Sequence, residues 1–437
     1  EGEEISVGST ILMFVVQMAV GAFVGYLFGR LSVWVMNKIN IDRRGKSKTR
    51  FKLTADFTKT PSNDIFGDIA VENLWLENSG GAYNIGNISL NSINRANTTY
   101  KMDLSSSFAK GTLTGTAPVT EFIKDVLGVT LKRELPSLFT DPSHSWKGNR
   151  YKMDFQFTNP QDILAWALPG LFLAEGTRLE VNLNDHGRFN ASIKSQRIAF
   201  VKQYLKDVEL TINNNDDMIS GSLTGSELKV ATLKLSDNTL TFIAEDDHVG
   251  IGYGYNNSGE LENRGEFIIH GDLHRGESGL DMTVKLLPST VYLHSREWRI
   301  RPSHMTLNRD GITSSDVRFV SNGQSISLHG GTSQSKADTL NLNLEQFDLS
   351  IVNPIFKTNL GIRGTASGKV QLTSPLPDKG ILVDIVSDST YFASQEVGRL
   401  NIMSEWDEMF NRFNIAALTE IDGRKALDAN VKFTPKT

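Results

Sequence analysis

The 437-residue chain is long enough for two or three ordinary domains, although long all-β units often exceed that size as one body. Its net charge of −5 is mild for this length, so no basic field indicates nucleic-acid binding. Cysteine is absent, which excludes disulfides, thiolate metal sites and cysteine nucleophiles and fits an oxidising compartment.

An uncharged apolar run extends from Ile11 to Gly29. At about 1.5 Å rise per residue, such a run nearly crosses a hydrocarbon core of ~30 Å. A signal peptide is the alternative, but the run is too long for one and acidic residues precede it. We therefore expect a transmembrane helix within residues 1–40, followed by a basic linker at residues 41–50.

Three glycines lie four residues apart in this run, at Gly21, Gly25 and Gly29. They would line one face of the helix and let a second helix approach closely. Glycine is also common in membrane helices generally, and the sequence leaves both interpretations open.

The charges around the predicted helix conflict with a periplasmic body. Basic residues follow the helix and acidic residues precede it, and positive charge tends to stay in the cytoplasm. Residues 4–42 resemble a transmembrane helix of bacterial cation/proton antiporters. The topology therefore stays open. The basic residues are Lys38, Arg43, Arg44, Lys46, Lys48, Arg50 and Lys52.

From Phe51 onward, apolar and polar residues alternate in short stretches separated by turn residues, which predicts β-strands. Val208, Leu210 and Ile212 give one example, and the Asn-Asn-Asn-Asp-Asp run at residues 213–217 predicts the turn that follows. One apolar face per strand is typical of an antiparallel sheet with one covered side. A body of about 28 strands in one sheet would extend about 130 Å at ~4.8 Å per strand.

Two stretches have helical spacing instead. The first covers residues 119–135, where apolar residues recur every three to four positions until Pro136. The second covers residues 160–170, for which we predict Asn159 as the N-cap and Pro160 in the first turn.

A loose internal repeat supports a quasi-repetitive β architecture over residues 51–437. Asn159-Pro160 is followed by apolar residues, then Gly176-Thr177 and a strand. Asn353-Pro354 is likewise followed by Gly364-Thr365 and a strand, at a shorter spacing.

The apolar face of so long a sheet must be covered by a second sheet, by curling, or by bound apolar material. A sheet folded lengthwise would form a groove in which acyl chains gain about 0.8 kcal/mol per buried methylene. A closed sheet-on-sheet core is the alternative that sequence cannot separate from a groove. The groove candidates are Leu340, Leu342, Leu344, Val370, Leu372, Leu400 and Ile402.

Motifs for catalysis or cofactors are weak. The glycine run at residues 250–254 is followed by turn residues rather than a helix, so close strand packing explains it better than nucleotide binding. His270 and His274 would share a strand face, but Gly271-Asp272 between them favours a turn or bulge. The acidic stretch at residues 245–248 predicts a solvated hairpin loop. A carboxylate pair for glycoside cleavage cannot be located from sequence. We expect no enzyme, cofactor or metal site.

A family resemblance rests on the segment from Pro288 onward. It contains Pro-Ser-Thr-Val-Tyr at 288–292, Trp-Arg-Ile-Arg-Pro-Ser at 298–303, and Phe-Asp-Leu-Ser-Ile-Val-Asn-Pro at 347–354. Together with residues 167–176, this succession resembles the TamB family of AsmA-like translocation and assembly proteins over residues 51–437. The chain stops at Thr437 without the family's C-terminal domain, which suggests a fragment.

The resemblance implies a long curved antiparallel sheet folded into a hydrophobic groove, a β-taco, in a periplasmic protein anchored in the inner membrane. It implies phospholipid as cargo and an outer-membrane β-barrel of the assembly type as partner, without catalysis. The alternative that we keep is a modular β-sandwich adhesin or surface binding protein.

Overall fold

We analysed a computed structural model, which describes residues 48–433 except 60–64, 79, 96–98, 130, 139–145, 215–217, 231–232, 258–261, 277–278, 294, 309–310, 332–338, 352–360, 374–379, 394 and 408–411. The predicted transmembrane helix, with Gly21, Gly25 and Gly29, lies outside these ranges. Within them, no helix has the length and apolar character needed to cross a membrane. The first strand begins at Lys48, inside the predicted linker.

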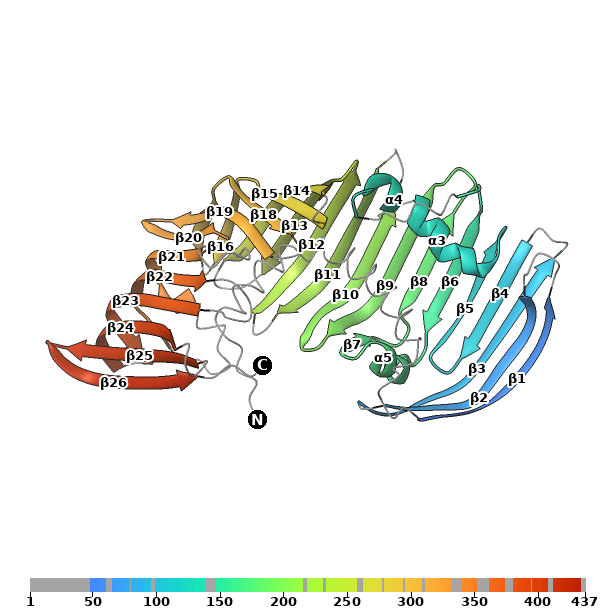
Figure 1. Cartoon of the computed structure of the whole chain (residues 1–437), viewed down its shortest axis with the longest axis horizontal. Coiled ribbons are helices and arrows are strands. Elements are labelled where there is room, and N and C mark those ends of the chain that lie inside the picture. Colours follow the sequence, from blue (N-terminus) through green and yellow to red (C-terminus); the bar gives the residue numbers. More distant parts are fainter. Residues whose placement is uncertain are drawn as a thin grey trace. The chain divides into compact units, whose positions relative to one another are not determined.

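The described chain is mainly β, as predicted, with 26 strands and short helices confined to residues 119–167 (Figure 1). It divides into two compact units. Unit 1 comprises residues 1–228 and 238–251, and unit 2 comprises residues 229–237 and 252–437. Each unit is described by itself.

In unit 1, strands pair antiparallel in the order β1, β2, β3, β4, β5, β6, β8, β9, β10. The short β7 pairs with β9 beyond the part that β8 covers. The bounds are β1 (Lys48–Lys59), β2 (Ile65–Asn78), β3 (Gly81–Arg95), β4 (Thr99–Ser106), β5 (Ala109–Gly115), β6 (Tyr151–Phe157), β7 (Leu171–Leu173), β8 (Arg178–Leu183), β9 (Phe189–Phe200) and β10 (Gln203–Asn213). Strands β11 (Ile219–Val230), β12 (Leu233–Glu245) and β13 (His248–Asn257) contribute residues to both units.

In unit 2, the remaining strands also pair antiparallel. Their bounds are β14 (Asn263–Gly276), β15 (Gly279–Leu286), β16 (Ser289–Leu293), β17 (Arg296–Ile300), β18 (Ser303–Asn308), β19 (Gly311–Ser321), β20 (Gln324–Gly330), β21 (Thr339–Asp348), β22 (Thr365–Thr373), β23 (Gly380–Phe392), β24 (Gln395–Asp407), β25 (Arg412–Ile421) and β26 (Arg424–Phe433).

The helices lie where sequence predicts them. The first region forms α3 (Val119–Val129) and α4 (Leu131–Glu134), and the second forms α5 (Gln161–Ala167). The predicted cap of α5 is wrong by one residue: Pro160 is the N-cap, and no side chain caps the helix. Because proline already holds φ near the helical value, the turn forms without a capping side chain.

Helix α3 covers the apolar face of unit 1 (Figure 1). Phe122 and Val126 pack on a buried cluster from β5, β6, β8 and β9. Buried Asp125 accepts hydrogen bonds from the Tyr151 hydroxyl at 2.6 Å and from the Asn149 amide at 2.7 Å. Burial, followed by this contact with Asp125, raises the pKa of Tyr151 well above its usual value. The cluster comprises Leu113, Ala117, Tyr151, Val181, Leu183, Phe189 and Ala191.

In unit 2, two prolines explain why short strands follow each other end to end along a longer neighbouring strand. Strands β15 and β16 follow each other along β14, and Leu287-Pro288 separates them. Strands β18 and β17 likewise follow each other along β19, on either side of Arg301-Pro302. Proline lacks the N–H that a ladder requires. The neighbouring N–H groups of Leu287 and Arg301 still donate to Ile268 and Arg318 in the flanking strands.

The internal repeat corresponds to a recurring connection between antiparallel neighbours. Across β6 and β8, the Gly176 N–H donates to the Phe157 carbonyl at 2.8 Å. Across β21 and β22, the Leu349 N–H donates to the Gly364 carbonyl at 2.9 Å. Asn353-Pro354 itself lies outside the described residues.

Candidate functional site

The register of unit 2 brings the predicted groove residues onto one face. Leu340 pairs with Leu372, and Leu342 pairs with Val370, across β21 and β22. Directly paired residues point to the same side of a sheet, so these side chains are neighbours.

The same face continues through β23 to β24. Leu344 pairs with Gly368, Gly368 with Ile385, and Ile385 with Ile402. Leu400 lies two residues before Ile402 and shares its face. All the predicted groove residues therefore lie on one surface, which we call the apolar face of unit 2.

Several members of the apolar face are not among the sequence candidates. Val317 and Phe319 pair with Leu328 and Ile326 at one side, and Ile415 and Ala417 continue the face on β25. Val383 and Ile385, whose alternation along β23 is visible in the sequence, are also members of the apolar face, because they pair with Val370 and Gly368. The register that joins them is a property of the folded sheet.

A bulge keeps Phe347 on the apolar face. The register between β21 and β22 shifts between Leu344 and Phe347, and Gln346 has φ +47°. In a regular strand, residues three apart point to opposite sides, and the extra residue of a bulge corrects this. Phe347 consequently pairs with buried Ala366 and is itself buried.

The apolar face is only partly covered. Leu340 is buried, at 6% exposure, whereas Leu342, Leu344, Val370, Leu372, Leu400 and Ile402 all keep some exposure. On β26, Leu427 and Val431 are more than half exposed. Among the described residues of unit 2 there is no α-helix that could cover this face as α3 does in unit 1.

Side chains of β17 and β21 meet although two other strands lie between them in the pairing order. The rings of Trp298 and Phe347 have centroids 6.2 Å apart. The Arg296 guanidinium forms an ion pair with the Asp348 carboxylate at 2.5 Å. On a flat sheet, strands three positions apart are separated by about 14 Å. These contacts indicate local curvature of the sheet around β19 and β20.

An aromatic group extends the buried side chains towards β13. Tyr253 stacks on Tyr255, with centroids 6.1 Å apart, and on Phe267 at 6.4 Å. The Tyr255 ring and Val291 both lie where a Cβ on Gly265 would project, so glycine is required at that position. Burial raises the pKa of Tyr255 to about 12.

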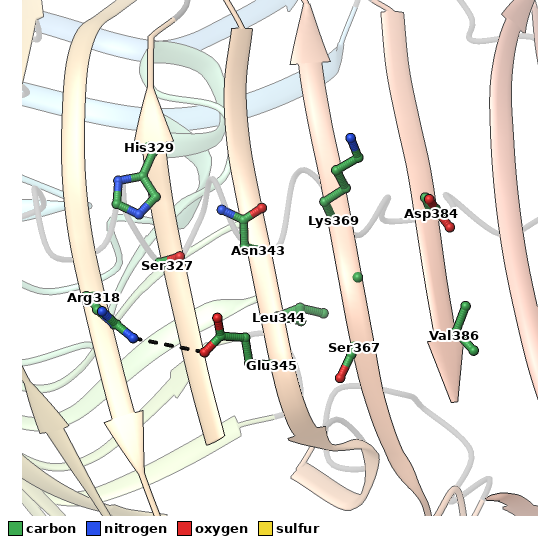
Figure 2. A pocket seen from close by; sticks show the side chains of 11 residues that line it. Arg318, Ser327, His329, Asn343, Leu344, Glu345, Ser367, Lys369, Asp384 and Val386 are labelled. Atoms are coloured by element: carbon green, nitrogen blue, oxygen red, sulfur yellow. Dashed lines mark ion pairs between the residues drawn. The ribbon is translucent and has the colours of Figure 1, made fainter. Parts of the chain in front are cut away.

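The opposite face of the same strands is polar. An open depression of about 710 Å³ crosses β19 to β23, and Figure 2 shows its charged side chains. Arg318 and Glu345 lie 4.0 Å apart across it. Because alternate residues point to opposite sides, this surface is the reverse of the apolar face. Leu344 and Gly368 of the apolar row also contribute atoms to its lining, and the lining residues of the reverse face are Arg318, Ser327, His329, Asn343, Glu345, Ser367, Lys369, Asp384 and Val386.

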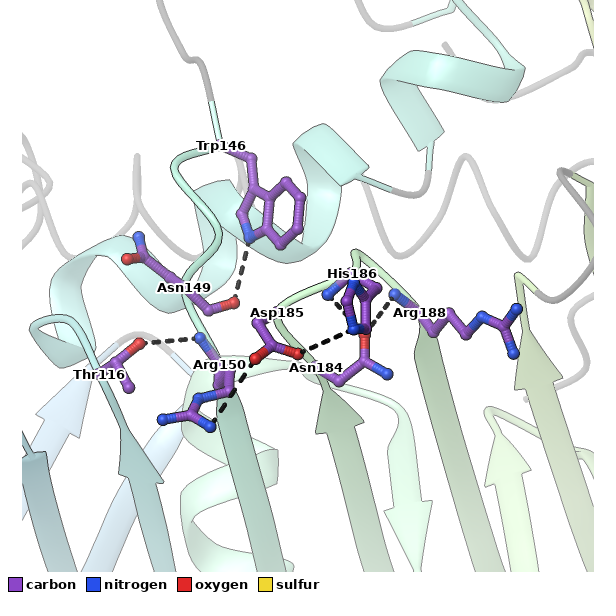
Figure 3. A network of polar contacts seen from close by, with 8 residues as sticks. All are labelled: Thr116, Trp146, Asn149, Arg150, Asn184, Asp185, His186 and Arg188. Carbon is purple, nitrogen blue, oxygen red and sulfur yellow. Dashed lines mark hydrogen bonds and ion pairs between the residues drawn. The ribbon is translucent and has the colours of Figure 1, made fainter.

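The loops at one end of β5, β6, β8 and β9 form a separate polar network (Figure 3). The Arg150 N–H donates to the Thr116 hydroxyl at 2.9 Å, and the Arg150 guanidinium lies 3.8 Å from Asp185. The Asn184 side-chain oxygen accepts from the N–H groups of His186 and Arg188. These contacts fix a turn and converge on no enclosed site.

One sequence interpretation about the weak motifs is wrong. Strand β14 pairs continuously with β15 through Gly271 and Asp272, so no turn or bulge separates His270 from His274. The hairpin predicted at residues 245–248 is present, with Glu245, Asp246 and His248 exposed, and only Asp247 is partly buried, in contact with Ser137. The glycine run at 250–254 lies inside β13, as close strand packing predicts. No cluster of three or more metal-ligand side chains occurs among the described residues.

Comparison with known proteins gives no match: none of the known protein families, the curated proteins or the solved structures corresponds to this chain. The resemblance to the TamB family therefore stays a prediction from the residues quoted for it.

Proposed function

We propose that this chain binds acyl lipid on the apolar face of unit 2 and acts, without catalysis, in lipid transfer or outer-membrane assembly in a bacterial envelope. The observation that supports this most directly is the partly exposed aliphatic surface from β19 to β25, formed by directly paired Leu, Ile and Val side chains.

The proposed mechanism is burial of acyl chains in a groove. Curvature between β17 and β21, supported by the Trp298–Phe347 contact, would bend the sheet around its aliphatic side. Each methylene that leaves water then contributes about 0.8 kcal/mol, and no directional contact is required along the chain. Lipid can therefore move along the groove by exchanging equivalent contacts.

The cellular setting rests on the sequence. The apolar run from Ile11 to Gly29 would anchor the chain in the inner membrane, with the β body in the periplasm. An outer-membrane β-barrel of the assembly type is the proposed partner. The basic residues after the run favour the opposite orientation, and a protease-accessibility assay on intact spheroplasts decides between the two.

Lipid extraction and mass spectrometry on the purified full-length chain test the proposal. We expect phospholipid at or above one molecule per chain, displaced by a soluble fatty acid. A well-folded, lipid-free monomer would contradict lipid binding. It would favour a protein with ordinary packed sheets, such as an adhesin.

A further inference from the structure

Polar side chains collect at one level of the apolar face. On each strand, this level holds the next residue of the same face after Ile300, Ile326, Leu344 or Ile402, counted in the direction of Phe347. We call it the polar ledge. It comprises Trp298, Ser321, Gln324, Ser387 and Thr419.

The polar ledge is placed by pairing as well as by alternation. Ser321 pairs with Gln324, and the Gln324 side-chain oxygen accepts from the Asp348 N–H at 3.2 Å. Ser387 pairs with Leu400, and Leu400 with Thr419. The ledge therefore lies in one row across the strands, in which Phe347, Ala366 and Leu400 separate the polar side chains.

Two atoms of the polar ledge are buried without a hydrogen-bond partner among the described residues: the indole nitrogen of Trp298 and the hydroxyl of Thr419. Their side chains are 2% and 1% exposed. By contrast, Thr390 is fully buried but donates to the Ser387 hydroxyl at 2.8 Å. Buried donors in proteins are nearly always paired, because an unpaired one costs free energy.

The position of these donors indicates the chemistry of the group that would pair with them. Trp298 pairs with Val291, and Thr419 pairs with Leu400 and Leu427, so aliphatic side chains lie beside both donors. A matching occupant carries acceptor oxygens at one end of an apolar chain. The ester carbonyl of an acylglycerol and the carboxylate of a free fatty acid both meet this description.

We propose that the polar ledge holds the acyl carbonyl end of a bound lipid, with its oxygen accepting hydrogen bonds from Trp298 Nε1 or Thr419 Oγ1. The acyl chain then extends along the strands over the rows that contain Leu344, Leu342 and Leu340. The two donors lie on β17 and β25 and define separate positions at the same level. This inference rests on the proposed lipid binding and adds the orientation of the lipid.

Entry to the Trp298 position requires the Phe347 ring to move, because its centroid lies 6.2 Å from that of Trp298. Phe347 follows the bulge at Gln346, where the ladder with β22 is interrupted. The ring is therefore attached to a section of β21 that lacks regular pairing on one side.

Displacement of a fluorescent fatty acid from the full-length chain by methyl palmitate, palmitate and hexadecane tests the orientation. These competitors share a chain type and differ in the oxygen group. We expect methyl palmitate or palmitate to compete about fivefold better than hexadecane, the ratio that one hydrogen bond of ordinary strength provides. The stronger of the two oxygen competitors identifies an ester or a carboxylate as the natural group.

Thr419→Val and Trp298→Phe remove the donors, and the double variant should reduce the preference for oxygenated competitors to near unity. Thr390→Val is the matched control, because its hydroxyl is already paired, and it should keep the preference. Thr419→Val preserves shape, so it tests the proposal even where Trp298→Phe fails to fold.

The outcomes separate the two proposals. An unchanged preference in Thr419→Val and the double variant overturns the orientation while leaving lipid binding in place. Failure of the wild-type chain to bind the fluorescent fatty acid at all overturns both. A downfield shift of the Trp298 indole proton with methyl palmitate, and none with hexadecane, would be direct support.

Discussion

Asp247 accepts two hydrogen bonds from Ser137, a residue 110 positions earlier in the chain. One comes from the Ser137 backbone N–H at 2.9 Å and the other from its hydroxyl at 2.8 Å. The Asp247 N–H donates in turn to the Glu134 carbonyl at 2.8 Å. The β12–β13 turn thereby holds the C-terminal end of the helical segment that covers unit 1.

Asp247→Asn should weaken this attachment. Asparagine tolerates the positive φ of 64° at this position but removes the charge that strengthens both hydrogen bonds. We expect a loss of about 1–2 kcal/mol in the free energy of unfolding, measured by chemical denaturation. Asp246→Asn is the control in the same turn, since that side chain is exposed, and it should change stability little. Equal stability of the two variants would show that the contact contributes nothing.

Charges placed on the apolar face should reduce lipid retention. The double variant with Leu342→Asp and Leu372→Asp places one carboxylate in each of two neighbouring rows of that face. Acyl chains that bind there would have to desolvate these carboxylates. We expect retained lipid per chain, measured by mass spectrometry, to fall at least tenfold while the circular dichroism of the sheet is kept.

The matched control places charges on the reverse face of the same strands, as Asn343→Asp with Gln371→Glu. It should retain lipid like the wild type, including any lipid held around the predicted anchor. If both double variants retain lipid equally, the bound lipid does not occupy the apolar face at these positions.

Gly368 should tolerate no side chain. Its φ is +151°, and a Cβ there would lie 2.1 Å from the Asp384 carbonyl oxygen and 2.7 Å from the Ile385 Cα. Gly368→Ala should therefore destabilise the chain by about 2 kcal/mol or more, because the backbone must shift. At Gly254 the nearest atom would be 3.8 Å away, so Gly254→Ala should be neutral or slightly stabilising in the same denaturation assay. Similar losses for both variants would refute the close approach of β22 and β23.

Stability should decline in alkali. A tyrosine whose folded pKa is raised contributes stability that is complete below its unfolded pKa, near 10, and that is lost as pH rises above it. Tyr151 and Tyr255 both have raised pKa values, chiefly because they are buried. Above pH 10, the slope of the free energy of unfolding against pH should be less steep in Tyr151→Phe by the contribution of one proton. That contribution is about 1.4 kcal/mol per pH unit.

The measurement is denaturant unfolding at pH values from about 8 to 11.5, where the two slopes can be compared. At neutral pH the variant should also be less stable, because Asp125 loses one of its hydrogen bonds. Parallel curves for wild type and variant would show that Tyr151 ionises in the folded protein as readily as in the unfolded one.

Much of the secondary structure follows from local pattern. Alternation in Leu340, Leu342 and Leu344 predicts β21, because a strand exposes every second side chain to the same side. The helical spacing before Pro136 predicts α3 and α4 for the same kind of local reason. The misplaced cap at Asn159 reflects the usual ambiguity of one residue at a helix end.

Interactions between distant residues account for what local pattern does not show. Gly271-Asp272 has the composition of a turn, yet pairing with β15 holds both residues in an extended strand. Asp247 has the composition of a solvated tip, yet the chain places Ser137 beside it. Asn214 follows β10 in the connection where the sequence predicts a turn, and its burial and its hydrogen bonds to the backbone of Gly187 and Phe189 are not evident from composition.

The sequence by itself determined which residues are apolar, where strands and helices form, and that one side of each strand is aliphatic. Only the tertiary structure decided that Leu344, Gly368, Ile385 and Ile402 form one row, and that Trp298 and Thr419 lie on the same level beside it. Alternation has a period of two residues and carries no information about register between strands. Register is decided when the bulge at Gln346 and the pairing of each strand with its neighbour are satisfied together.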